Sequence, residues 1–388
     1  SYMNPQRVYQ HNNPGRLIFG PKSVNELANE IPANEIPLVI TDQGVAKSGI
    51  LKRVTDVLEG AGIRHHIFDG IEPDPPTEVV GKAVSLFQKH GCTMVIGVGG
   101  GSSMDGAKAV SLMASHPGDI REYGAGKLID GPLIPIYAIP TTAGTGSEVT
   151  GVAVISDREN KIKMVLRGAP HLIPKCVFLD PELLAFIPQK VAAETGGDAL
   201  THAIETYVSQ NSTVITEGLA LSSITLVGKY LRRFVGNPED TEAAEQMLLA
   251  SYLAGFAFSN GGLGLVHALA HPVGAYFHLS HGLSCSLYLP VVMEFNLVTC
   301  PEKFAAVAEA LGEDIRGMSC RRAAKESVKA VRELFADIGI PRNFSEMGVA
   351  FQLNPKMVED ALAAVPTKLN PRRSNKEQIT NLFNAPLG

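Results

Sequence analysis

Residues Met94 to Lys108 read MVIGVGGGSSMDGAK, and this stretch decides the fold of the first half of the chain. Its apolar beginning has the composition of a buried strand. The strand leads directly into a turn made of Gly99, Gly100, Gly101 and Ser102. Glycines let the backbone approach an anion closely, and the free amides of a first helical turn point toward it. The stretch therefore predicts a strand, an anion-binding turn and a helix; a tight structural turn without a ligand is the alternative.

An earlier strand pattern, Pro37–Gly44, ends in an acidic residue, Asp42, and a glycine. A carboxylate at the carboxyl end of a parallel strand can accept hydrogen bonds from ribose hydroxyls, and it repels a 2′-phosphate. Asp42 therefore indicates NAD rather than NADP, with a helix N-cap as the alternative role. The order differs from the usual dinucleotide fingerprint, in which the glycines precede the acid.

A third strand pattern, Ile134–Pro140, opens into a loop in which glycine alternates with hydroxyl residues. The side chains of interest in this loop are Thr141, Thr142 and Thr145. They offer many hydrogen-bond donors and little bulk beside a ligand, although a flexible loop would have a similar composition. The segments that follow, Val152–Ile155 and Lys163–Leu166, are predicted to form the two strands of a hairpin around a polar turn.

Strands alternate with helical patterns up to residue 187, which predicts a parallel sheet covered by helices on both faces, an α/β fold of Rossmann-like type. From residue 188 the strand signals vanish and apolar residues recur with a period near 3.6. We expect an α/β dinucleotide-binding domain over 1–187 and an all-helical metal-binding domain over 188–388. The predicted helices are Val191–Tyr207, Thr216–Phe234, Asp240–Phe258, Leu263–Ala275, Pro290–Val298, Pro301–Ala310, Ser319–Ile338 and Pro355–Ala364.

The candidate metal ligands all lie in the helical half. Residues 258–282 read FSNGGLGLVHALAHPVGAYFHLSHG and hold four of the eleven histidines. His267 and His271 are four apart and share a helix face, as do Asp198 and His202 upstream. Three imidazoles and one carboxylate, from His202, His267, His281 and Asp198, can close around a divalent transition metal. Ordinary helix residues satisfied by their neighbours are the alternative.

Bulk composition narrows the function classes. The chain has 388 residues, is 45% apolar and carries a net charge of −5. It shows no basic stripe, which argues against a nucleic-acid partner. The five scattered cysteines favour a reducing compartment, the polar first residues lack a secretory signal, and no apolar run reaches membrane-spanning length. We expect a cytoplasmic protein that has no membrane partner.

With these pieces in place, the chain resembles the iron-containing (group III) alcohol dehydrogenases over nearly its whole length. Residues 256–274 look most like the branch that interconverts lactaldehyde and 1,2-propanediol. The resemblance implies a dehydroquinate synthase-like fold. The matching residues are Gly99–Ser102 with Asp105 and Lys108, Thr141–Thr145 with Ser147 and Glu148, Gly196–Leu200 with His202, and Gly262–Gly264 leading to His267, His271 and His281.

The resemblance implies a role for each matching residue. It assigns Asp198, His202, His267 and His281 to the metal, which is Fe²⁺ or alternatively Zn²⁺. It assigns to NAD(H) the residues Asp42, Gly99, Gly100, Gly101, Ser102, Thr141, Thr142 and Thr145, with Lys163 and Leu179 as outer contacts. His271 matches a catalytic histidine near the nicotinamide, and Phe258 matches a wall of the substrate pocket.

Three positions depart from the family pattern. Asp74 stands where relatives often carry Asn, Pro366 where some lactaldehyde-reducing members place Cys, and Val152, a candidate pocket residue, where they place Asn. The expected reaction is hydride transfer between NAD(H) and a short primary alcohol, or a diol, and its aldehyde. The expected assembly is a homodimer or a larger homo-oligomer. Rival readings are a zinc polyol dehydrogenase, a lyase built like dehydroquinate synthase, and a non-catalytic binding protein.

Overall fold

The computed structural model describes residues 3–388 and divides the chain into two compact units. One unit covers residues 12–187, which we call the α/β unit. The other, the helical unit, combines the segment through His11 with Pro188–Gly388. The N-terminal segment thus groups with the helices rather than with the sheet that follows it, and residues 1 and 2 of the expected first domain lie outside the described part.

The α/β unit is built on a six-stranded sheet in which every described strand pair is parallel. The strand order is β1-β8-β5-β4-β2-β3. β2 and β4 are buried along their whole length, as expected for strands covered on both faces. The strands are β1 (Arg16–Phe19), β2 (Pro37–Ile40), β3 (His66–Phe68), β4 (Met94–Gly99), β5 (Ile136–Pro140) and β8 (Cys176–Leu179).

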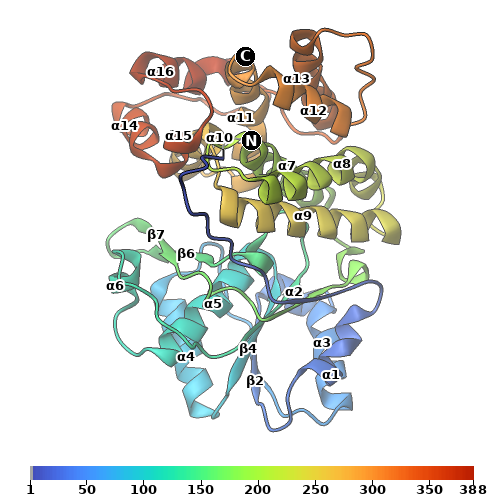
Figure 1. Cartoon of the computed structure of the whole chain (residues 1–388). Helices are drawn as coiled ribbons and strands as arrows, with labels where there is room; N and C mark the ends of the chain where they lie inside the picture. Colours follow the sequence, from blue (N-terminus) through green and yellow to red (C-terminus); the bar gives the residue numbers. More distant parts are fainter. Residues whose placement is uncertain (1–2) are drawn as a thin grey trace. The chain divides into compact units, whose positions relative to one another are not determined.

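Helices cover both faces of this sheet. α4 and α5 pack together on one face, whereas α1 and α3 pack together on the other (Figure 1). Right-handed crossovers account for this division, because the chain leaves β2 toward β3 and then returns past β2 to β4. The helices are α1 (Leu27–Glu30), α2 (Gln43–Lys47), α3 (Ile50–Gly60), α4 (Thr77–Lys89), α5 (Gly101–Ser115) and α6 (Ile120–Gly124), with short 3-10 turns η1 (Ser23–Glu26), η2 (Ser147–Val149) and η3 (Pro181–Leu184).

The predicted hairpin is present as β6 (Val152–Asp157) and β7 (Ile162–Arg167), which pair antiparallel. Buried and partly buried residues alternate along β6, because one face of the ribbon packs on the unit and the other does not. The predicted parallel sheet with helices on both faces, followed by an all-helical region, is confirmed.

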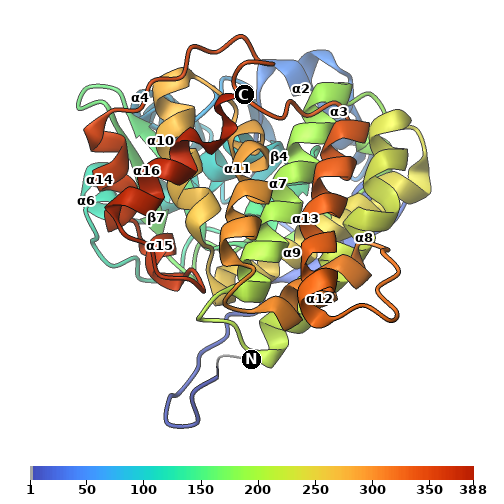
Figure 2. The same cartoon turned by 90° about the horizontal axis from the view of Figure 1, so that it is seen from above.

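The helical unit contains no strand among its described residues. α7, α10 and α11 run side by side in it, with α11 between the other two (Figure 2). Its helices are α7 (Gln189–Val208), α8 (Val214–Gly236), α9 (Thr241–Gly261), α10 (Leu265–Phe277), α11 (His281–Asn296), α12 (Pro301–Ala310), α13 (Cys320–Asp337), α14 (Pro355–Ala363), α15 (Val365–Leu369) and α16 (Lys376–Asn384), with the turn η4 (Ala385–Leu387).

Three features of this unit differ from expectation. α11 begins at His281, nine residues before the predicted start at Pro290, and α15 and α16 were not predicted. α8 is long and apolar enough to cross a membrane by length and composition, contrary to the expectation that no apolar run reaches that length. The same test is passed by core helices of proteins that never enter a membrane, and α8 packs against α7 and α9.

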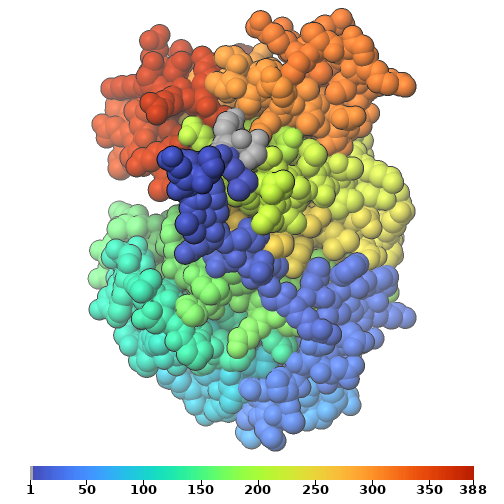
Figure 3. All heavy atoms as spheres, viewed as in Figure 1, coloured from blue at the N-terminus to red at the C-terminus, as the bar shows by residue number. Residues whose placement is uncertain are grey.

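The N-terminal segment of the helical unit is visible on its surface in Figure 3. The ring of His11 lies 5.2 Å from that of Phe256 on α9, tilted by 57°. Burial lowers the pKa of His11, so the ring packs there in its neutral form. This aromatic contact fixes the segment to the helices.

Candidate functional site

α7 carries the first two predicted ligands on one buried face. Asp198 and His202 are one turn apart, and their side chains are 3% and 4% exposed. Oδ1 of Asp198 lies 3.2 Å from Nε2 of His202. The glycines before Asp198 make room for neighbouring helices, because a Cβ on Gly197 would lie 2.0 Å from Oγ of Ser286 on α11. The sequence GGDALTH therefore lets α11 approach α7 closely at the level of the site.

α10 and α11 supply the other two imidazoles. His267 lies in the first turn of α10, which follows the tight turn at Gly262 and Gly264. His281 is the first residue of α11, because the hydroxyl of Ser280 accepts a hydrogen bond from the amide of Leu283 and caps the helix. A short link between two helices thus places two histidines fourteen positions apart beside each other, with ring centroids 5.2 Å apart.

The four predicted ligands meet at the carboxylate of Asp198. Its Oδ1 lies 3.3 Å from Nε2 of His281 and 3.9 Å from Nε2 of His267, in addition to the contact with His202. Nitrogen and oxygen ligands about 2.0–2.1 Å from one cation are about 3.3 Å apart in a tetrahedral site. Within the described residues, Oδ1 of Asp198 is buried and has no hydrogen-bond partner. The separations and the unpaired oxygen both fit a bound divalent cation.

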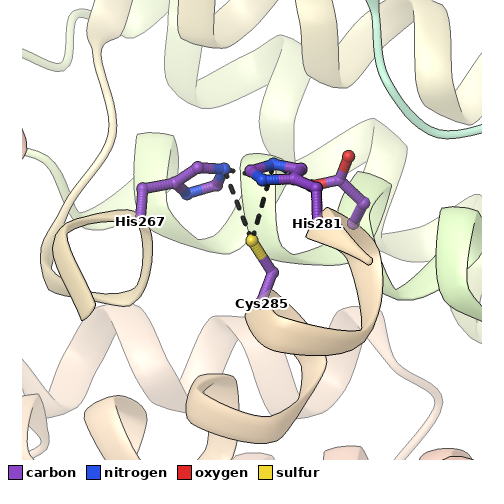
Figure 4. Close-up of side chains that lie close together, drawn as sticks. His267, His281 and Cys285 are labelled. Carbon is purple, nitrogen blue, oxygen red and sulfur yellow. Dashed lines mark hydrogen bonds and ion pairs between the residues drawn. The ribbon is translucent and has the colours of Figure 1, made fainter. Parts of the chain in front are cut away.

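Cys285 joins this group although sequence reasoning did not include it. It lies one turn after His281 on α11 and is fully buried. Its sulfur lies 3.7 Å from Nε2 of His267 and 3.6 Å from Nε2 of His281 (Figure 4). One ligand atom from each of Asp198, His267, His281 and Cys285 falls within 4.8 Å of all the others.

Glu205 is a second residue that sequence reasoning missed. It lies seven residues after Asp198, on the same face of α7, and its Oε1 lies 2.6 Å from Nδ1 of His267. Oε2 accepts a hydrogen bond of 2.8 Å from the amide of Val266. A Cβ on Gly264 would lie 2.7 Å from this oxygen, so the glycine is needed for the approach. A carboxylate on Nδ1 fixes the imidazole with Nε2 unprotonated and facing the cluster.

Burial controls the protonation of the cluster. It lowers the pKa of His267 to about 3 and that of His202 to about 4, so both rings are neutral near pH 7. Burial alone would raise the pKa of Asp198, but the imidazoles, led by His202, hold it below its usual value. Burial raises the pKa of Glu205 to about 7. Burial alone would lower the pKa of His281, but the contacts with Cys285 and Asp198 raise it well above its usual value. Neutral imidazoles and an ionised carboxylate are the forms that bind a metal, so His281 gives up its proton on binding.

One side of the cluster is open. The side chain of His281 is 44% exposed, whereas that of His267 is 2% exposed. His271 is exposed on α10, with its ring 5.5 Å from that of His281 and 5.9 Å from that of His267. Phe258 is partly buried on α9, and its ring lies 4.4 Å from that of His202. The two residues expected beside a substrate therefore lie at the edge of the cluster.

The predicted cofactor residues of the α/β unit gather at the carboxyl ends of β2, β4 and β5, which are neighbours in the sheet. The crossovers after β2 and β4 go to opposite faces of the sheet, so β2 and β4 flank a topological switch point, where α/β sheets commonly bind ligands. Gly99 has a φ of +145°, and a Cβ there would lie 2.7 Å from Oγ of Ser103. Gly101 opens α5 beneath the side chain of Thr145, 3.0 Å from where its Cβ would be.

Asp42 has the capping role that was the alternative reading. Its Oδ1 accepts a hydrogen bond of 2.8 Å from the amide of Val45 at the start of α2. Ser103 donates a longer bond of 3.4 Å to Oδ2. The carboxylate thus sits between the ends of β2 and β4, and Oδ2 remains well placed for a further donor. A ribose contact at Asp42 stays a prediction.

The remaining predicted residues of this unit, Lys163, Leu179 and Val152, do not lie at the carboxyl ends of β2, β4 and β5. Lys163 on β7 forms an ion pair of 2.8 Å with Asp74. Leu179 is fully buried at the end of β8, and its carbonyl accepts a hydrogen bond from the amide of Gly20. Val152 is partly buried at the start of β6, where its carbonyl accepts a bond of 2.9 Å from Lys108. Their contacts with cofactor or substrate stay predictions.

Comparison with known proteins agrees with this architecture. Residues 14–181 match the family model described as iron-containing alcohol dehydrogenase, and residues 192–387 match the one described as the C-terminal part of that family. The NAD-dependent methanol dehydrogenase of Bacillus methanolicus is 38% identical over 372 residues, 95% of this chain and 97% of that protein. The lactaldehyde reductase of Escherichia coli strain K12 is 37% identical, covering 94% of this chain and 96% of that protein.

A solved structure of a 1,3-propanediol oxidoreductase superimposes with a TM-score of 0.94 at 37% identity, covering 98% of this chain and 100% of that one. The sheet, the helical unit and these relatives define an enzyme of the alcohol and aldehyde oxidoreductase class. More narrowly, the chain belongs to the iron-containing alcohol dehydrogenase family.

Proposed function

We propose that this enzyme interconverts a short primary alcohol, or a diol, and its aldehyde by hydride transfer with NAD(H), using a divalent cation held by the helical unit. The observation that carries the proposal is the meeting of three imidazole nitrogens at the unpaired Oδ1 of Asp198. The relatives support it, since one is named NAD-dependent methanol dehydrogenase and another lactaldehyde reductase.

In this proposal the cation is held by Asp198, His202, His267 and His281, and is Fe²⁺ with Zn²⁺ as the alternative. When bound, it stabilises negative charge on the substrate oxygen as a Lewis acid. Glu205 holds His267 in the tautomer that leaves Nε2 free for it. The single carboxylate of Asp198 offsets part of the cation's charge, while the neutral imidazoles leave the rest available to the substrate.

The remaining residues position the reactants. His271 lies at the exposed edge of the cluster, where an imidazole can pass the alcohol proton to solvent. Phe258, whose ring lies beside that of His202, contacts the substrate in this proposal. Nicotinamide supplies the hydride acceptor. Its pyrophosphate would lie at the start of α5, where the amides after Gly99 and Gly100 offer donors, and Asp42 would accept from the ribose.

The lyase reading fits the structure less well. An enzyme that binds a carboxylated phosphosugar needs several free cations around its site, and the sequence offers Lys368, Arg372 and Arg373 as candidates. The guanidinium of Arg372 instead donates a bond of 2.8 Å to the carbonyl of Phe295 and lies 4.0 Å over that ring. An arginine already committed to a carbonyl and an aromatic face is poorly placed to hold a phosphate.

The experiment that tests the proposed function compares wild type with His267→Ala. We expect wild type to bind about one equivalent of cation and to oxidise NADH with short aldehydes. We expect His267→Ala to lose most of the cation and about a hundredfold or more in kcat/KM. His278→Asn is the matched control, because His278 is exposed outside the cluster and has a positive φ that Asn tolerates. Normal NADH turnover by His267→Ala with unchanged metal content would refute the proposal.

We also propose a cytoplasmic location and a homodimer or larger homo-oligomer, because free buried thiols suit a reducing compartment and the family resemblance implies assembly. Differential labelling of the thiols in intact cells and light scattering of the purified protein test these two points.

A further inference from the structure

Cys285 differs from the other buried cysteines in what surrounds its sulfur. Its side chain is fully buried on α11, one turn after His281, and points between two imidazole rings (Figure 4). Both rings present Nε2 to the sulfur, at 3.7 Å for His267 and 3.6 Å for His281. A thiol that served only to fill space would more commonly meet carbon atoms.

The distances match those between ligands of one cation. Ligands with a metal–nitrogen distance of about 2.05 Å and a metal–sulfur distance of about 2.3 Å lie about 3.5–3.6 Å apart at a tetrahedral angle. The two measured nitrogen–sulfur distances are within about 0.2 Å of this value. A thiol can donate one hydrogen bond and its sulfur can accept another, so these two distances point to a cation only together with a second observation.

A second observation points to a ligand at the same place. Asp198 is 2% exposed, and its Oδ1 has no hydrogen-bond partner among the described residues. This oxygen, the two imidazole nitrogens and the sulfur all lie within 4.8 Å of one another. His202 is outside this closest set, although its Nε2 lies 3.2 Å from the same oxygen.

We propose that Cys285 is itself a ligand of the cation, binding through its sulfur in addition to Asp198, His202, His267 and His281. This inference rests on the proposed function, because it concerns the same metal centre. Binding breaks the S–H bond, forms a metal–sulfur bond and releases the proton to solvent, with no change of oxidation state.

A thiolate ligand changes which cations the site prefers. Sulfur ligands select soft or borderline ions such as Zn²⁺ over Mn²⁺ and Fe²⁺, which prefer oxygen and nitrogen. The second negative ligand also offsets more of the cation's charge than Asp198 does alone. We therefore expect the site to favour Zn²⁺ and Co²⁺ over Fe²⁺ more strongly than a centre made of one carboxylate and three imidazoles.

The test is X-ray absorption spectroscopy at the zinc edge of the full-length wild type loaded with one equivalent of Zn²⁺. We expect one sulfur neighbour at about 2.3 Å. Cys285→Ser and Cys285→Ala should lose this neighbour, and their Co²⁺ forms should lose the near-ultraviolet thiolate-to-cobalt absorption. Cys300→Ser is the matched control, because Cys300 is also buried in the helical unit but has no part in the cluster. Its spectra should equal those of wild type.

The outcomes separate the two proposals. Wild type that holds a full equivalent of cation with only nitrogen and oxygen neighbours overturns the role of Cys285 and leaves the proposed function standing. Wild type that holds no cation overturns both. The wild-type spectrum by itself decides whether Cys285 binds the cation, so the test does not depend on whether the Cys285 variants fold. A shift in the Zn²⁺-to-Fe²⁺ affinity ratio toward Fe²⁺ in Cys285→Ser would support the expected preference.

Discussion

Replacement of Glu205 by Gln is the sharpest test of how the cluster is held. Glu205 uses one oxygen for Nδ1 of His267, at 2.6 Å, and the other for the amide of Val266, at 2.8 Å. Gln has only one oxygen. If that oxygen takes the amide of Val266, the NH₂ group faces Nδ1 and forces the proton to Nε2, which then cannot bind a cation.

If the oxygen instead faces Nδ1, the NH₂ group of Gln meets the amide of Val266, and two donors oppose each other. Either arrangement weakens the site. Loss of such a supporting carboxylate typically costs 10- to 100-fold in metal affinity, which corresponds to about 1.4–2.7 kcal/mol. We therefore expect the Kd for Zn²⁺ to rise by about 10- to 100-fold in Glu205→Gln.

The assay is competition for Zn²⁺ against a chromophoric chelator at pH 7.5, with circular dichroism to verify folding. Glu217→Gln is the control, because Glu217 is a partly buried carboxylate of the same unit that pairs with Lys303 at 2.8 Å, away from the cluster. It should change stability but not the Kd. A folded Glu205→Gln protein that binds Zn²⁺ as tightly as wild type would show that the carboxylate does not set the tautomer of His267.

Three further predictions concern the α/β unit. Gly99→Ala places a side chain at a φ of +145° and 2.7 Å from Oγ of Ser103. We expect the affinity for NADH, measured by fluorescence titration, to fall by about tenfold or more while the metal content stays unchanged. Gly81→Ala is the control and should have no effect, because a Cβ at Gly81 would lie in open space. Asp42→Ser keeps an acceptor for the cap of α2 but removes the negative charge that repels the 2′-phosphate of NADPH. The ratio of kcat/KM with NADPH to kcat/KM with NADH should therefore rise about tenfold or more. An unchanged ratio would exclude a contact between Asp42 and the ribose. Burial lowers the pKa of Lys108 to about 8, so between pH 8 and 10.5 the unfolded chain binds a proton that the native protein does not. The free energy of unfolding of wild type relative to Lys108→Met, measured by urea unfolding, should therefore rise with pH across this window, by about 1 kcal/mol per pH unit at most. A difference that does not change with pH would contradict the lowered pKa.

The sequence predicted the sheet well because its strands are continuous apolar runs that end in glycine or acid. The predicted strand Met94–Val98 differs from the observed β4 by one residue, whereas the pattern Pro37–Gly44 begins with β2 but continues past its end at Ile40. The order of the strands was less accessible, because it depends on packing between segments distant in sequence. The helix pairs at spacing four were also predictable, which is why Asp198 and His202 were identified together.

Cys285 was missed for a specific physical reason. The apolar period predicts a helix that begins only at Pro290, a residue type that suits the first turn of a helix. In the structure α11 already begins at His281, capped by Ser280, and Pro290 lies inside it. Once the helix begins at His281, the spacing of four to Cys285 places both side chains on one face. Glu205 carried a similar signal, seven residues after Asp198, but only the fold shows that His267 lies against it.

The donors of the cluster come from α7 and from the consecutive helices α10 and α11, which lie far from α7 along the chain. A cation shared by the three would act as a crosslink that exists only in the native state. The free energy of unfolding of the helical unit would then depend on the free metal concentration. It would rise by about 2.7 kcal/mol when that concentration is a hundred times the Kd. Chelators in a storage buffer would therefore make the protein unfold more readily as well as inhibit it.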